Sequence, residues 1–311
     1  MKTLRHAPFL SVLALAALAG GCSDTPVNPG AQSSVEETKV LQGLNAAPDF
    51  LSDGLFDADV VTNLAPSLRG PNAAPSAAGA AIEPFFFWRS ITGRTRAFEF
   101  AFSDSDSTDR PTTAVVTLRR TFTGTFNIVP RDPVNPDLPD AGHVIRKPLE
   151  DHWVRRFLLK RVANGPGTDV IWRLAASSAV EVTSKDATTL ITSIRLQTDT
   201  KDTTLTDPLA FIHLRRVLRF GTQDTVTVTV TTPRTDDVVL LYFRDRRVPF
   251  TNNGDGTYTR KFLAGLFTGW RHFGVNALAH GTLFDDAAAY DSKAWIVPYV
   301  IVGGPDLDYL P

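Results

Sequence analysis

Residues 113–128 read TAVVTLRRTFTGTFNI, and their side chains alternate between apolar and polar over most of that length. Leu118, Phe122 and Phe126 fall on one side of an extended chain, whereas the threonines and Arg119 fall on the other. Successive side chains of a strand point to opposite faces, so this period of two predicts a long β-strand with one buried face. The stretch therefore predicts a mainly β fold.

The same period continues before and after this stretch. Phe98, Phe100 and Phe102 occupy alternate positions, and SDSDSTDRP at 103–111 is typical of a turn, so a long hairpin is predicted. Further apolar runs follow at 153–162, 170–174, 180–183 and 190–196. We expect one curved antiparallel sheet over residues 85–211.

The last third of the chain has shorter strand patterns. TVTVTVT at 225–231 alternates strictly, and VVLLYF at 238–243 is apolar throughout, as expected of a strand buried on both faces. NGDG at 253–256 predicts a hairpin turn with positive φ, which Asn and Gly adopt at low cost. Short strands with frequent turns predict a β-sandwich over residues 212–311.

Two family resemblances follow from these patterns. NGDGTYT, followed by a strand that contains Gly269 and Trp270, resembles the later strands of bacterial immunoglobulin-like domains over about Arg215 to Gly303. This segment has no cysteine pair, and Phe273 stands where a corner tyrosine is expected. The long paired strands ending in WRL at 172–174 resemble the NTF2-like cone, an α+β fold that also needs closing helices.

The N-terminus has the features of a secretory signal peptide. Lys2 and Arg5 precede an uncharged apolar run at 7–19, which at ~13 residues is shorter than the ~20 that a membrane-spanning helix needs. Small residues at 19–21 then precede Cys22, the single cysteine of the chain. The sequence therefore predicts export and a special role for Cys22.

Residues 15–22 resemble the lipobox of bacterial lipoproteins, although Ala19 stands where leucine is commoner. The resemblance implies that the Cys22 thiol is joined to diacylglycerol, that the chain is cut before it, and that the new amine is acylated. Several acyl chains anchor a protein stably in a membrane. Ser23 after the cysteine points to the outer membrane in the enterobacterial sorting pattern. The alternative is an ordinary secreted protein with an incidental cysteine.

The sequence divides into five predicted segments. We expect the signal peptide at 1–21 and a flexible tether at 22–34, rich in Pro, Ser and Gly. A weak helix and an Ala/Pro-rich linker follow at 35–84, the antiparallel β domain at 85–211, and the sandwich at 212–311.

The amino-acid composition limits the classes of function that this protein can have. The 32 basic and 33 acidic residues nearly balance, which excludes the basic footprint of a nucleic-acid-binding protein. The common short catalytic and nucleotide-binding motifs are absent from the sequence, and we expect no cofactor. The leading expectation is a non-catalytic binding or scaffolding module of the cell envelope, with a protein or glycan partner. The alternative is a small-molecule binder or enzyme that uses a pocket on the concave face of the first sheet.

Arg120 interrupts the apolar face of its predicted strand, next to Leu118 and Phe122. A charge among apolar side chains is costly unless it is paired or reaches water. Two readings remain open: a structural ion pair with Glu99 or Glu181, or a pocket residue that binds an anion. Arg120 is therefore the candidate ligand-binding residue.

Three other groups carry metal-binding side chains. Asp104, Asp106 and Asp109 are either a calcium loop or a solvated hairpin tip. His272 and His280 are expected on one strand, too far apart to share an ion. The remaining group follows no known zinc spacing, so no metal is predicted; its members are Asp140, His143, Glu150, Asp151 and His152.

Overall fold

The computed structural model describes residues 35–51, 61–64, 81–107, 110–163, 170–243 and 246–303. Strands predominate in these ranges, where one sheet has 11 strands and a second has 5. The fold is therefore mainly β, as the sequence predicts. The predicted signal peptide, Cys22 and the tether lie outside the described residues. Within the described ranges, no helix has both the length and the apolar character needed to cross a membrane.

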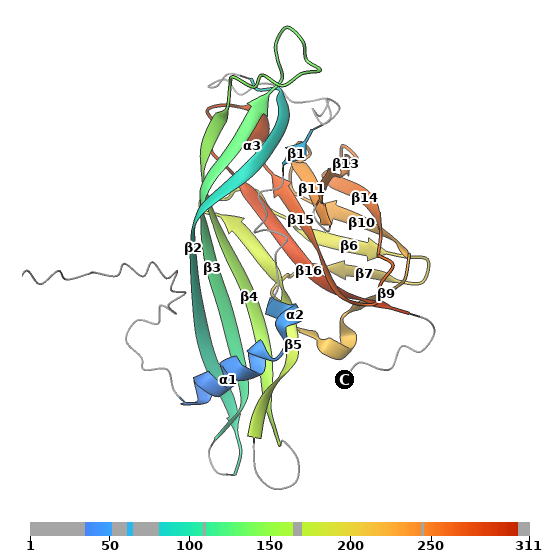
Figure 1. Ribbon diagram of the computed structural model, residues 1–311. Helices are drawn as coiled ribbons and strands as arrows, with labels where there is room; N and C mark the ends of the chain where they lie inside the picture. The colour runs from blue at the N-terminus through green and yellow to red at the C-terminus, as the bar shows by residue number, and fades with distance from the viewer. Residues whose placement is uncertain are drawn as a thin grey trace, which may run out of the picture.

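Four long strands form one side of the molecule (Figure 1). They are β2 (Pro84–Ser105), β3 (Pro111–Pro130), β4 (Ile145–Ala163) and β5 (Val170–Ser184). β3 contains the alternating stretch 113–128, and its Leu118, Phe122 and Phe126 are buried. The predicted hairpin is confirmed, because Phe98 of β2 lies opposite Leu118 of β3. The apolar runs at 170–174 and 180–183 both belong to the single strand β5.

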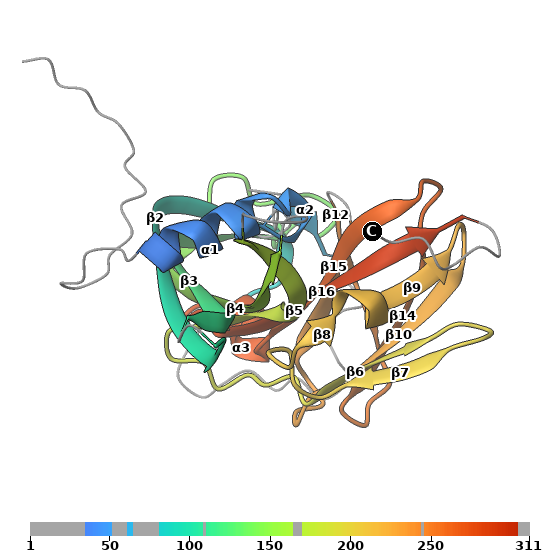
Figure 2. The same cartoon turned by 90° about the horizontal axis from the view of Figure 1, so that it is seen from below.

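The 11-stranded sheet curls on itself and is here called the curled sheet (Figure 2). Its hydrogen-bonded order is β1-β2-β3-β4-β5-β16-β15-β11-β12, and β1 also contacts β12, so the two ends of this order approach each other. β8 pairs with β5, and β9 pairs in parallel with β16. The strands not yet bounded are β1 (Thr62–Asn63), β8 (Ile212–His213), β9 (Leu218–Gly221), β11 (Val238–Phe243), β12 (Arg246–Pro249), β15 (Gly269–Leu278) and β16 (Ser292–Val302).

The 5-stranded sheet, here called the second sheet, packs against the convex side of the curled sheet (Figure 1). Its order is β13-β14-β10-β6-β7. The strands are β6 (Ser193–Gln197), β7 (Asp202–Leu205), β10 (Thr225–Thr231), β13 (Thr251–Asn252) and β14 (Thr257–Leu263). Val226, Val228 and Val230 of β10 are fully buried, which confirms the alternation predicted for residues 225–231.

Two hydrophobic cores lie on opposite faces of the shared strands. Leu240 of β11 belongs to the core inside the curled sheet, whereas its neighbour Leu241 belongs to the core between the two sheets. β11 is therefore buried on both faces, as the continuous apolar run 238–243 predicts. The inner core is also lined by long side chains of β3 and β4, including Phe126 and Trp153.

Strands from both sides of residue 212 pair within each sheet. In the curled sheet, Val182 of β5 lies opposite Ala294 of β16. In the second sheet, Leu196 of β6 lies opposite Val228 of β10. The first and last parts of the chain are thus joined by backbone hydrogen bonds and by common cores.

Short helices lie near the ends of the curled sheet (Figures 1 and 2). The predicted helix near Val40 is confirmed as α1 (Val35–Asn45), which is followed by α2 (Pro48–Leu51). Val40 and Leu44 are fully buried in the inner core, so α1 is part of the compact body. At the other end, α3 (His280–Phe284) contributes Leu283 to the same core.

The predicted hairpin turn at 253–256 joins β13 to β14. Gly254 has a φ of 85° and Gly256 a φ of 84°, values that favour glycine over residues with a Cβ. The strand pairing through Tyr258 and Asn252 confirms the predicted turn.

Candidate ligand-binding site

Arg120, the candidate from sequence, lies on the concave face of the curled sheet. It is half-buried, and its guanidinium carbon is 5.0 Å from the centroid of the Trp153 ring on the neighbouring strand. A cation over an indole face gains electrostatic energy from the ring. This contact explains how the apolar face of β3 accommodates the charge.

The two carboxylates expected beside Arg120 contact other cations. Glu99 accepts a hydrogen bond of 2.7 Å from Nε of Arg119, and Glu181 lies 2.6 Å from Nζ of Lys293. Arg119 and Arg120 are adjacent in a strand, so they face opposite sides of the sheet. The two carboxylates expected to form an ion pair with Arg120 therefore bind Arg119 and Lys293.

Two more arginines join Arg120 on the concave face. Arg96 is the backbone partner of Arg120, and its guanidinium lies 4.5 Å from the centroid of Phe98. Arg155 lies 5.3 Å from the centroid of Phe157, and its Nε donates to the Ser177 hydroxyl over 3.1 Å. Each of these three cations thus sits over an aromatic ring.

His272 of β15 lies close enough to Arg155 to be affected by its charge. Burial lowers the pKa of His272 to about 3, and the positive charge of Arg155 adds to this shift. The imidazole is therefore neutral at physiological pH. The expectation that His272 and His280 share a strand is wrong, because β15 ends at Leu278 and His280 begins α3.

A buried ion pair holds the upper part of the interior. Nη1 of Arg89 donates to Oδ2 of Asp151 over 2.8 Å, and the Tyr290 hydroxyl donates to the same oxygen over 3.2 Å. Burial raises the pKa of Asp151 in spite of the attraction of Arg89. Nearby, Nζ of Lys147 donates to the carbonyl of Asp285 over 2.6 Å, and burial lowers its pKa to about 8.

The structure separates the metal-binding side chains noted in the sequence. Asp151 is occupied by Arg89, whereas Glu150 and His152 lie on the other face of β4, where Glu150 binds Lys185. Two pairs from this group lie together, Asp140 with His143 in the loop after β3, 3.9 Å apart, and Glu150 with His152 on β4, 3.4 Å apart. Among the described residues, no group of three or more such side chains could hold an ion.

The acidic loop at 104–109 forms the tip of the β2–β3 hairpin. Asp104 accepts a hydrogen bond of 2.8 Å from the Thr113 hydroxyl, and Asp106 accepts one of 3.1 Å from the Arg110 amide. Asp109 lies outside the described residues. The carboxylates of Asp104 and Asp106 thus close the hairpin.

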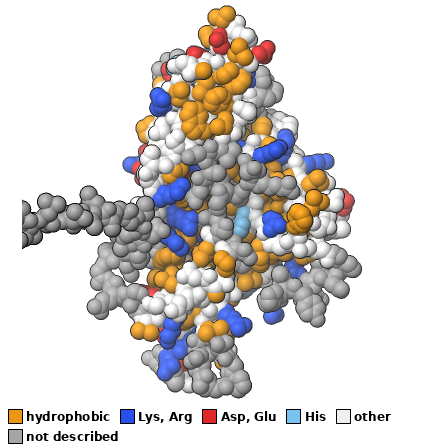
Figure 3. Space-filling view, viewed as in Figure 1, with side chains coloured by type: hydrophobic (Ala, Val, Ile, Leu, Met, Phe, Trp, Pro, Cys, Tyr) orange, Lys and Arg blue, Asp and Glu red, His pale blue; other side chains and the backbone are white. Residues whose placement is uncertain are grey.

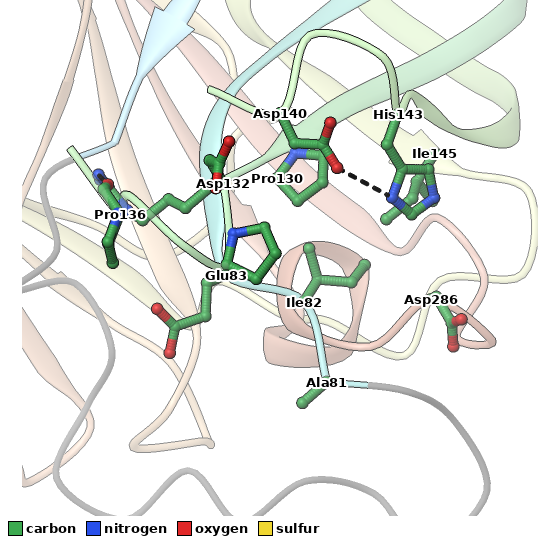
Figure 4. Close-up of a pocket in the computed structure, with 12 residues that line it drawn as sticks. Ala81, Ile82, Glu83, Pro130, Asp132, Pro136, Asp140, His143, Ile145 and Asp286 are labelled. Carbon is green, nitrogen blue, oxygen red and sulfur yellow. Dashed lines mark hydrogen bonds and ion pairs between the residues drawn. The ribbon is translucent and has the colours of Figure 1, made fainter. Parts of the chain in front are cut away.

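A cleft of about 420 Å³ opens at the upper end of the curled sheet, and we call it the upper cleft (Figure 4). It is formed by the start of β2, the loop between β3 and β4, and the residue Asp286 after α3. Ile82 and Pro130 lie in its middle, and the Asp140–His143 pair lies at its margin. The lining residues are Ala81, Ile82, Glu83, Pro130, Arg131, Asp132, Pro133, Pro136, Asp140, His143, Ile145 and Asp286.

Hydrogen bonds hold the loop that forms one wall of the upper cleft. Arg131 donates from Nη1 to the carbonyl of Pro136 over 2.8 Å and from Nη2 to that of Leu64 over 2.7 Å. Asp132 accepts from the amides of Val134 and Asn135, and these two bonds lower its pKa. The wall is therefore fixed before any ligand arrives, as is usual for small-molecule sites.

The upper cleft combines an apolar floor with an acidic margin. Isoleucine and proline side chains supply the floor, and among the described residues four carboxylates line the cleft against one arginine and one histidine. The arginine, Arg131, is bound to backbone carbonyls. This charge balance favours a ligand that carries positive charge.

The segment 130–142 is rich in proline and carries none of the short motifs that mark a binding site. The other walls come from residues near 82, 145 and 286, so only the fold brings the lining together. The signal that the sequence offers is the acidic character of the proline-rich loop itself, with Asp132, Asp137 and Asp140.

Comparison with known proteins adds no family: no protein-family model, curated protein or solved structure matches this chain.

Proposed function

We propose that this protein is a non-catalytic binding module of the bacterial cell envelope, anchored in the outer membrane through an acylated Cys22. The apolar run at 7–19 and the small residues before Cys22 support the anchor. The tether at 22–34 gives the folded body a reach on the order of 20 Å from the lipid surface.

The binding role rests on one observation, the preformed upper cleft of about 420 Å³. Its volume lies in the range of about 300–1,000 Å³ that is typical of small-molecule sites. The floor around Ile82 and Ile145 would bury an apolar group, and the margin around Asp140 would attract a cation. The ligand we propose is a small molecule, or the end of a partner, with an apolar body and an amine.

Blocking the cleft tests this proposal. The chain from Ser23 onward, which contains every described residue, is titrated with 2-phenylethylamine in a calorimeter. Ile82→Trp should abolish the binding heat because the larger side chain fills the floor. Leu138→Trp is the matched control, since Leu138 is 53% exposed in the loop between β3 and β4 and does not line the cleft. Unchanged binding by Ile82→Trp would overturn the proposal.

A second candidate places an anionic small molecule on the concave face. The observation that favours it is the row of Arg96, Arg120 and Arg155 on three adjacent strands. In this case Arg120→Leu would abolish the binding of an anionic probe such as benzoate while Ile82→Trp would leave it unchanged. The opposite pattern would leave the upper cleft as the site.

We also propose that the sandwich formed with the second sheet is immunoglobulin-like and that the curved strands with α1 are NTF2-like. The turn at 253–256 and the strictly alternating β10 support the first relation. The packing of α1 against β5 supports the second. A solved structure of a sequence relative with either topology would test these assignments.

A further inference from the structure

A second opening, of about 350 Å³, lies where the edges of the two sheets meet, and we call it the edge slot. It is remote in sequence from the upper cleft and shares no lining residue with it. Its lining residues are Leu241, Phe243, Arg246, Val248, Arg260, Lys261 and Phe262.

Strand register explains how one wall of the edge slot forms. In the β11–β12 hairpin, Leu241 lies opposite Val248, and Phe243 lies opposite Arg246. Directly paired residues in antiparallel strands share a face. These four side chains therefore stand together on the convex face of the curled sheet, directed toward the second sheet.

The other wall belongs to β14 of the second sheet. Phe262 is 93% buried and meets the ring of Phe243 with centroids 4.8 Å apart, so the two rings join the walls at the floor. Arg260 is two positions away on the same face, and its Nη1 donates to the carbonyl of Pro249 over 3.2 Å. This bond spans the two sheets and uses only one of the several N–H donors of the guanidinium.

The slot is open because both of its walls lie at sheet edges. β13 pairs with β14 only at Tyr258 and Thr259, so within the described residues β14 has no partner on that side from Arg260 onward. β12 likewise ends the hydrogen-bonded order of the curled sheet. Figure 3 shows Lys and Arg side chains beside hydrophobic ones on the side of the molecule where β13 and β14 lie.

The charged side chains that the structure describes in the lining of the edge slot are all basic. Among the residues that the structure describes, Arg246, Arg260 and Lys261 line it, and no carboxylate does. At two other places on the strand surface, exposed cations lie beside acids, Arg119 with Glu99 and Arg195 with Asp202. The slot therefore differs from these two places, where opposite charges offset each other.

We propose that the edge slot binds an amphiphile with an anionic head group, a carboxylate or a phosphate ester, and an apolar chain. The chain lies over the floor formed by Phe243 and Phe262, and the head group meets the cations at the rim. Arginine is well suited to such a head group because its planar N–H donors match carboxylate and phosphate oxygens. This site is independent of the function proposed for the upper cleft.

Titration with dodecanoate below its micelle concentration tests the edge slot, again on the chain from Ser23 onward. Dodecanol, which lacks the charge, and butyrate, which lacks the chain, should each bind at least tenfold more weakly. Arg246→Glu with Lys261→Glu should weaken dodecanoate binding at least tenfold. Lys160→Glu, an exposed lysine at the far end of β4, is the matched charge control and should leave binding unchanged.

The same variants distinguish the source of the amphiphile. Retention on phosphatidylglycerol vesicles that is lost in the Arg246/Lys261 double variant indicates a membrane lipid, whereas dodecanoate binding without retention indicates a free fatty acid. Thermal unfolding of each variant confirms that the fold is intact. Equal binding of dodecanol and dodecanoate, or full binding by the double variant, would overturn the proposal.

Discussion

Gly43 of α1 packs directly against the backbone carbonyl of Trp172 in β5, so closely that a Cβ at position 43 would collide with that oxygen. Two turns earlier in the helix, Glu36 accepts a hydrogen bond of 3.1 Å from Nε1 of Trp172. α1 is thus held to the curled sheet by one tryptophan at two points.

Gly43→Ala should detach or displace α1. The added methyl group has no space, and overpacking of this kind costs about 1–3 kcal/mol. Thermal unfolding of the variant should occur at a lower temperature, with faster amide exchange in residues 35–45. Gln42→Ala, on the exposed side of the same helix, is the control and should change neither measurement.

Burial of His272 makes stability depend on pH. Its pKa is about 3 in the folded protein, against 6.5 for an unperturbed histidine. Between these values the unfolded chain binds a proton that the folded protein does not, so the stability present above pH 6.5 is lost as the pH falls. We expect this residue to lower the free energy of unfolding by about 1.4 kcal/mol per pH unit.

Denaturant unfolding at about pH 5 and pH 7 measures this effect. His272→Phe should reduce the difference between the two values, whereas His213→Gln at an exposed position should not. An identical pH dependence in wild type and His272→Phe would show that the imidazole titrates normally.

Local patterns predicted the individual strands well, because periodicity reports which face of a strand is buried. Residues 113–128, 225–231 and 238–243 all lie in strands with the expected burial. Local patterns could not predict which strands pair with each other in a sheet. The pairing of β5 with β16 joins residues more than a hundred positions apart, and no local signal encodes that register.

The segment 212–311 expressed alone should fail to fold cooperatively. Its β10 would lose the pairing with β6, and its β16 would lose that with β5, which leaves two long edges exposed. Circular dichroism and a thermal melt of the isolated segment check this. A sharp unfolding transition of the segment would show that the sandwich is autonomous.

Cys22→Ala should release the protein from the membrane. Without the thiol no diacylglycerol can be attached, and the remaining chain has no second lipidation site because Cys22 is its single cysteine. Detergent phase partitioning of cells that express wild type and variant measures the change. Cys22→Ala protein that partitions with the membrane as wild type does would refute the lipid anchor.

The candidate sites show why sequence finds some functional positions and misses others. Arg120 could be identified from the sequence because it interrupts the alternation of apolar and polar side chains in its own strand. The ring of Trp153 beside it explains how the strand accommodates this charge. The upper cleft was not visible, since Ile82, Pro130 and Asp286 come from three separated segments and each is ordinary in its local context.

The charge preference of the upper cleft shows whether it binds a cation with an apolar body. Calorimetric titration compares 2-phenylethylamine with 3-phenylpropionate, which have similar apolar parts and opposite charges. We expect the amine to bind at least tenfold more tightly than the acid. Asp140→Asn should weaken amine binding by about two- to fivefold, as a partly exposed ion pair implies. Asp199→Asn, an exposed aspartate outside the cleft, should have no effect. Equal binding of amine and acid, or no binding of either, would show that the upper cleft is not a site for a cationic ligand.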